Sequence, residues 1–152
     1  MAVFVANEQP IEVDEENLMR LARLAMGELG VEESELSVLI VDSDAMRRLN
    51  ARWMGQDRPT DVLAFPMDEE APEYDEEEEE EAEPWLLGDV VLCPEVAREN
   101  AESLGRGLGE ELELLCVHGI LHCAGYDHTD GEEEKEMTEE TERLLTLHHG
   151  EK

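Results

Sequence analysis

Hydrophobic and polar positions along the chain alternate between strand-like runs and helical spacing. Apolar, β-branched runs predict strands at four places, residues 2–6, 35–42, 60–66 and 88–94. Leucines and alanines three and four residues apart predict an amphipathic helix that Asp14 caps and Gly30 stops. Three more helices are predicted, one capped by Ser43 and closed by Gly55, one from Pro94 to about Leu104, and one from Asp130, with Glu133 in a capping box, to about Leu147. This irregular alternation predicts an α+β domain around a small mixed sheet.

The segment from 109 to 124 is apolar on nearly every side, which predicts a central, largely buried helix. It carries His118 and His122, whose spacing of four residues points both rings in nearly the same direction, one turn apart. A continued helix would carry His128 away from them, so the helix must end first, and Gly125 is suited to ending it. Three histidines meeting in this way would leave one position of a tetrahedral metal open, as in catalytic zinc sites. The same ligands would accept nickel or copper.

The stretch HGILHCAGYDH, residues 118–128, matches the spacing of the metzincin protease pattern H-E-x-x-H-x-x-G-x-x-H. Gly119 stands where those proteases carry the glutamate that activates water, so the usual peptidase base is missing. The glycine would let the sheet or a substrate come close to the metal, and close helix packing alone explains it as well. Asp127 could orient a ligand ring, transfer a proton or simply cap the turn. The residues do not name the general base.

The chain of 152 residues carries 42 acidic side chains against 11 basic ones, a formal charge of −31. Its length predicts a single domain over residues 1–152, and its charge repels free nucleic acid at long range. Twelve of the eighteen residues at 67–84 are acidic, so we expect a loop without a core there. This acidic insert is either a solvated low-complexity segment without a specific role, a segment that repels the wrong nucleic acids, or one that attracts a basic partner. The first ten residues resemble neither a signal peptide nor a membrane span, which predicts a cytoplasmic protein.

Four of the eleven basic residues lie within twelve positions and form a local cationic cluster on an acidic chain, namely Arg47, Arg48, Arg52 and Arg58. They are candidate contacts for RNA phosphates, and ordinary helix-surface arginines are the alternative. The three cysteines are expected to be small buried apolar residues, because Cys116 and Cys123 lie too far apart on one helix for a disulfide. His148 and His149 are expected in a mobile tail, without a role.

The chain resembles the YbeY family of bacterial metal-dependent endoribonucleases of ribosomal RNA maturation. The resemblance rests on HGILHCAGYDH, GQDRPTDVLAFP and LLGDVVLCPEVA, and more weakly on Met137 and Glu140. It implies a zincin-like α+β fold with zinc on His118, His122 and His128. It also implies single-strand-specific cleavage in maturation of the 3′ end of 16S ribosomal RNA, and a role in ribosome quality control.

One departure from the family stands in the G-x-D-x-P-T block, where many members carry an arginine implicated in RNA handling just before the glycine. This chain has Met54 there, so that role is not carried over. Because the acidic protein should bind free RNA weakly, a ribosomal protein or assembly factor with a basic surface is the expected partner on the small ribosomal subunit. The rival functions are a non-catalytic assembly factor stabilised by its metal, and a zinc peptidase.

Overall fold

The computed structural model describes residues 2–66, 86–126 and 131–150. A four-stranded sheet lies at its centre, built from β1 (Ala2–Asn7), β2 (Glu35–Ile40), β3 (Val62–Pro66) and β4 (Leu86–Leu92). The strand order is β1-β2-β4-β3; the first three of these neighbours run parallel, and β3 pairs antiparallel with β4. The small mixed sheet predicted from the hydrophobic pattern is therefore confirmed.

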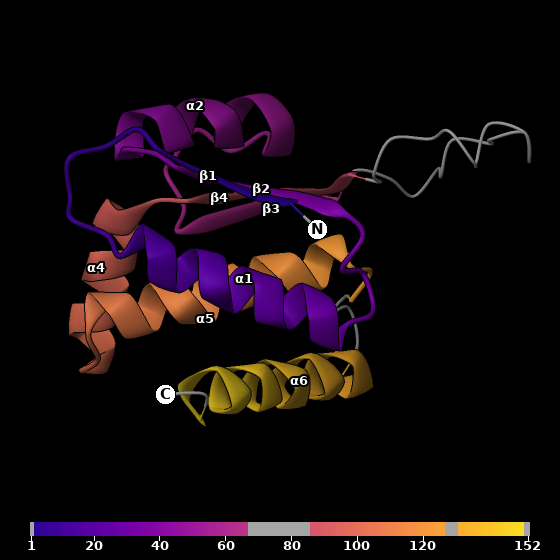
Figure 1. Ribbon diagram of the computed structural model, residues 1–152. Helices are drawn as coiled ribbons and strands as arrows, with labels where there is room; N and C mark the ends of the chain where they lie inside the picture. The colour runs from indigo at the N-terminus through magenta and orange to yellow at the C-terminus, as the bar shows by residue number, and fades with distance from the viewer. Residues whose placement is uncertain (1, 67–85, 127–130, 151–152) are drawn as a thin grey trace, which may run out of the picture.

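Helices lie on both faces of this sheet (Figure 1). The described part of the chain contains α1 (Glu15–Glu28), α2 (Ser43–Met54), α4 (Pro94–Leu104), α5 (Leu108–Cys123) and α6 (Gly131–Gly150). α5 contacts β3, β4, α1 and α6, and α2 covers the opposite face of the sheet. None of these helices, among the residues the structure describes, is long and apolar enough to cross a membrane.

Alternation along β2 divides the hydrophobic interior into two clusters. Leu36, Val38 and Ile40 are fully buried and pack with α1 and α5 in the larger cluster. Leu39, on the other face, packs against a smaller cluster that includes Met46 of α2. Because the larger cluster takes side chains from most of the length of α5, that helix is the buried central helix that its composition predicts.

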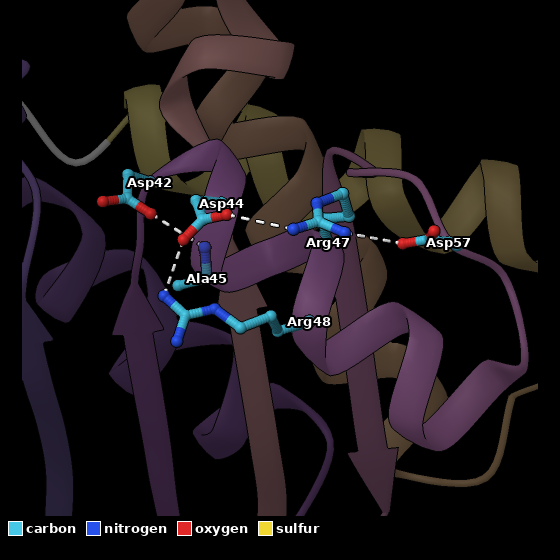
Figure 2. A network of polar contacts seen from close by, with 6 residues as sticks. All are labelled: Asp42, Asp44, Ala45, Arg47, Arg48 and Asp57. Atoms are coloured by element: carbon cyan, nitrogen blue, oxygen red, sulfur yellow. Dashed lines mark hydrogen bonds and ion pairs between the residues drawn. The ribbon is translucent and has the colours of Figure 1, made fainter.

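The predicted helix ends at Asp14, Gly55, Pro94 and Leu104 are confirmed, and the predicted cap at Ser43 is wrong. Asp14 caps α1 by accepting a hydrogen bond from the Asn17 amide at 3.0 Å, and α2 ends at Gly55, in the left-handed conformation. The cap of α2 is Asp42, whose carboxylate accepts from the Ala45 amide at 2.8 Å, as Figure 2 shows. Ser43 is instead the first helical residue, because Asp42 has extended backbone and its carboxylate reaches the third amide.

The end of α6 also differs from the prediction. The helix continues to Gly150, past Leu147, and His148 is 2% exposed, so the expected mobile tail is wrong for His148 and His149. Contacts with distant helices hold this end, since His148 lies 2.8 Å from the Asn17 amide oxygen. The predicted capping box at Asp130 and the acidic insert at 67–84 lie outside the described residues.

Candidate metal centre

His118 and His122 lie on the last two turns of α5, on the side of the helix that the core leaves uncovered. Both side chains are half-buried, and their ring centroids are 4.9 Å apart with the ring planes at 70°. The four-residue spacing thus brings the two imidazoles together as predicted. Two imidazole rings at this separation can bind a single ion between them.

A cavity of about 450 Å³ opens beside the two histidines. Its wall on α5 consists of His118, Gly119 and His122, and residues of β3 form the facing wall. Met54, at the end of α2, also lines this cavity and is 47% exposed. Met54, just before the glycine of the G-x-D-x-P-T block, therefore lies beside the candidate centre, a placement that the sequence did not reveal.

The helix ends where the histidine spacing requires. α5 stops at Cys123, and Gly125 has a φ of +102°, a left-handed backbone conformation that glycine adopts without steric cost. The Gly125 amide donates to the His122 carbonyl at 3.1 Å, and the Tyr126 amide donates to the Leu121 carbonyl at 2.9 Å. These bonds turn the chain back after the second histidine, as in a helix C-cap.

The third predicted ligand, His128, and its neighbour Asp127 lie outside the described residues. Within residues 2–66, 86–126 and 131–150, no three histidine, cysteine, aspartate or glutamate side chains are grouped so that they could hold a metal ion. The described pair is therefore two thirds of the predicted ligand set. The complete set stays a prediction.

Gly119 has a packing reason that the structure makes explicit. A Cβ at this position would lie 2.7 Å from Cγ1 of Val90 and 3.1 Å from Cγ2, so β4 presses directly against this turn of α5. Of the two explanations for a glycine between the histidines, close packing of helix on sheet is therefore supported. A glutamate here, as in the peptidases, would collide with Val90.

The predicted cationic cluster lies on α2 and the loop after it, and two of its members are already paired with acids (Figure 2). Arg47 contacts Asp57 at 2.8 Å and Asp44 at 3.3 Å, and Arg48 contacts Asp44 at 2.7 Å. The hydrogen bond from Arg47 and the positive charge of Arg48 lower the pKa of the Asp44 carboxyl below its usual value. An RNA phosphate would have to compete with these carboxylates for the two guanidinium groups.

The other two arginines of the cluster have different neighbours. Arg52 lies 5.1 Å from the centre of the Trp53 ring, and Arg58 donates to the side chain of Gln56 at 3.0 Å. Trp53 is 59% exposed, so this pair presents a cation and an aromatic ring on the surface. A phosphate-binding role for the cluster stays a prediction.

The three cysteines are buried and unbridged, as their sequence context predicts. Burial raises the pKa of the Cys116 thiol to about 12, and it raises the pKa of the Cys123 thiol to about 12 as well. Burial also raises the pKa of Cys93. These side chains stay protonated at neutral pH, and a thiolate is the form that binds metal or attacks a substrate. They therefore act as apolar core residues.

Fold and site together define a class: a mixed α+β protein whose buried central helix presents two histidines, one turn apart, to a cavity at the edge of a small sheet. The sequence profile of the family described as Endoribonuclease YbeY matches residues 4–148. The chain belongs to the YbeY endoribonuclease family.

Similar proteins with this description come from several bacteria. The Endoribonuclease YbeY of Salinispora tropica is 52% identical over 95% of this chain and 94% of its own length, and that of Thermobifida fusca is 48% identical over 95% and 92%. The solution structure of a protein from Thermotoga maritima superposes with a TM-score of 0.64 at 30% identity. That superposition covers 98% of this chain and 90% of the other, so the two proteins share the fold that the described residues form.

Proposed function

We propose that this protein is a zinc-dependent endoribonuclease that cleaves single-stranded RNA. The observation that carries the proposal is the pair His118 and His122, whose ring centroids lie 4.9 Å apart beside a cavity, in a chain of the YbeY endoribonuclease family. A hydrolase that works through a histidine-bound metal needs such a combination of adjacent nitrogen ligands and space for a substrate. We propose that the fold around this centre is zincin-like.

The metal would be held by His118, His122 and His128. The two described residues fit a zinc ion because neutral imidazole nitrogens are among its preferred ligands and both rings lie on one side of the helix. When bound, such a metal supplies a Lewis acid for a phosphodiester oxygen and a water of lowered pKa. Nickel or another divalent metal suits the same nitrogen ligands.

The remaining chemistry falls to side chains around the cavity. Asp127 would orient a histidine ring or move a proton, as a carboxylate next to a ligand commonly does. The exposed arginines of the cluster, Arg47, Arg48, Arg52 and Arg58, would contact phosphates of the strand outside the cavity. Met54 lines the cavity itself and offers an apolar contact, so no cation at this position neutralises the phosphate being cleaved.

We propose the 3′ end of the precursor of 16S ribosomal RNA as the substrate, together with RNA of defective ribosomes in the cytoplasm. A formal charge of −31 makes binding of free RNA weak and strongly dependent on salt. A ribosomal protein or assembly factor with a basic surface would therefore bring the enzyme to its RNA on the small subunit. The family name supports the reaction, and the charge supports the need for a partner.

The test incubates precursor small-subunit RNA, free and in assembled particles, with metal-loaded protein, metal-stripped protein and the His122→Ala variant. We expect cleavage only by the loaded wild-type protein, more rapid in particles, and its recovery when zinc is returned to the stripped protein. His149→Ala is the matched control, because this histidine is exposed and lies on α6. Cleavage that survives both stripping and the His122→Ala change would refute the metal mechanism.

The same protein forms, assayed in addition with a labelled peptide, separate the rival functions. A non-catalytic assembly factor would associate with particles and cut no RNA in any form, and loss of metal would only lower its thermal stability. A zinc peptidase would release a labelled peptide and leave RNA intact. The packing of Gly119 against Val90 counts against the peptidase, since it leaves no space there for the usual glutamate base.

A further inference from the structure

A second cavity, of about 480 Å³, lies between α5 and α6 and adjoins the candidate metal centre. His118 and Val62 line both cavities, so the two spaces meet at the first histidine of the pair. A strand that passes His118 in the first cavity therefore has an adjacent space into which one of its units can turn. The volume is within the range of about 300–1,000 Å³ that small-molecule pockets occupy.

The floor of this second cavity is apolar. Besides Val62 of β3, its apolar lining comes from two helices, with Leu114 and Leu115 on α5 and Met137 and Leu145 on α6. Such a floor between two helices suits the face of a flat, weakly polar ring. Removing that face from water is what would stabilise its binding.

The polar groups around the cavity are nearly all hydrogen-bond acceptors. Thr138 donates its hydroxyl proton to the Glu134 carbonyl at 2.9 Å, and Thr141 donates to the Met137 carbonyl at 2.7 Å, so both hydroxyls face a ligand only through oxygen lone pairs. The carboxylates of Glu134 and Glu142 add further acceptors. The described lining residues include no arginine or lysine.

An acceptor-rich rim with carboxylates repels a phosphate and favours groups that carry N–H donors. In an RNA strand the bases carry those donors, and the backbone carries the negative charge. From this we propose that the cavity between α5 and α6 is a subsite for one nucleobase next to the scissile phosphate, with a preference for the amino-bearing bases adenine, cytosine and guanine over uracil. The inference rests on the proposed endoribonuclease function and adds a determinant of sequence preference to it.

The test fills the cavity from its exposed side with Thr138→Trp. Thr138 is exposed on α6, so the indole can enter the cavity without displacing the core. Thr146→Trp is the matched control, because Thr146 is an exposed threonine on the same helix and outside the lining. Thermal melting of both variants should stay within a few degrees of the wild-type protein, which shows that they fold.

Cleavage is first measured on a set of single-stranded RNA oligonucleotides that each lack one base, which identifies any position where the base matters. A second set then places each of the four bases at that position. With wild-type protein and with Thr146→Trp, we expect one position beside the cut where loss of the base lowers kcat/KM by about tenfold or more. Uracil should be the weakest substrate there. Thr138→Trp should cleave the intact RNA about as slowly as wild-type protein cleaves the abasic one, and lose the preference.

Binding gives a readout that does not depend on cleavage, using oligonucleotides with the fluorescent base 2-aminopurine at successive positions. We expect the fluorescence at one position to change on binding to wild-type protein and Thr146→Trp, and to stay unchanged with Thr138→Trp. If wild-type protein binds in this way and cuts no RNA, the proposed function fails, and the cavity is shown to bind a base without setting a cleavage preference. If wild-type protein cuts RNA with no sensitive position, or both tryptophan variants behave alike, the subsite is refuted.

Discussion

Two pairs of histidines, one at the end of α5 and one at the end of α6, have opposite surroundings. His118 and His122 are half-buried and line the cavity beside β3. His148 is 2% exposed, and His149 beside it is 50% exposed. Both side chains of the α6 pair reach one carboxylate, that of Glu113 on α5, at 3.7 Å and 2.9 Å.

The spacing of each pair explains the difference. Residues four apart on a helix point the same way, so the α5 pair converges on one open space. Adjacent residues differ in direction by about 100°, so in the α6 pair one ring enters the core and the other follows the surface. The buried ring is satisfied by Asn17 at 2.8 Å, and Asn17 donates to Glu113 at 2.7 Å. A histidine pair serves packing where polar side chains close around it, and can serve chemistry where it borders a cavity.

The largest expected effect on activity comes from replacing one histidine of the α5 pair by alanine, and it contrasts with the same replacement in the α6 pair. His118→Ala should lower RNA cleavage by at least about a hundredfold and reduce metal affinity, because it removes a ligand. His148→Ala should instead lower the free energy of unfolding by about 1–3 kcal/mol, because it removes a buried ring and that ring's contact with the Asn17 amide oxygen. Metal titration and urea denaturation of both variants measure the two properties.

The comparison fails if His148→Ala loses metal and keeps its stability, or if His118→Ala unfolds as easily as the other variant. Both proteins should be compared in metal-stripped form, since a bound metal adds its own stabilisation.

A smaller effect is expected at Gly119, between the two histidines of α5. Gly119→Ala should lower the free energy of unfolding by about 1–3 kcal/mol, because the added methyl group would lie 2.7 Å from Val90. Gly109→Ala on the same helix has no neighbour within 4 Å of the new Cβ and should be neutral or slightly stabilising. Urea denaturation of both variants checks this.

A second substitution sharpens this test. In a Val90→Ala background the cost of Gly119→Ala should fall, because the smaller side chain leaves space for the methyl group. An undiminished cost would show that Gly119 is needed for a reason other than its contact with β4.

The last effect is absent at neutral pH and appears only at alkaline pH, where it reports whether water reaches the core-facing side of α5. Cys116 has a pKa of about 12 in the folded protein, above the ordinary value of 9.0. The unfolded chain therefore releases this proton first, and stability should fall as pH rises from about 9 toward 12, by at most about 1.4 kcal/mol per pH unit for one thiol. Below pH 9 the thiol should contribute no pH dependence.

Urea denaturation at pH 8 to 11 measures this slope, and Cys116→Ala isolates it from lysine and tyrosine titration. The variant should lose stability less steeply over this range than the wild-type protein. Equal slopes for the two proteins would mean that water reaches Cys116 and that the core-facing side of α5 is hydrated.

Local features of this protein could be predicted from the sequence alone. The end of α5 before Gly125, and the convergence of His118 and His122, follow from helical spacing and the left-handed conformation of one glycine. Asp14 as a cap follows from the same local logic. Where two local candidates compete, as Asp42 and Ser43 do, the pattern does not decide between them.

Only the tertiary structure decided the features that depend on distant parts of the chain. His148 is buried because α6 packs against the helices that carry Asn17 and Glu113, and its ring contacts both side chains. Asn17 is 131 residues away in the sequence. Met54 borders the candidate centre because α2 ends near β3, and Gly119 is required because β4 lies against it. Helical periodicity determines which side chains share a face. Which surface meets that face depends on the packing of the whole core, which no short stretch of sequence contains.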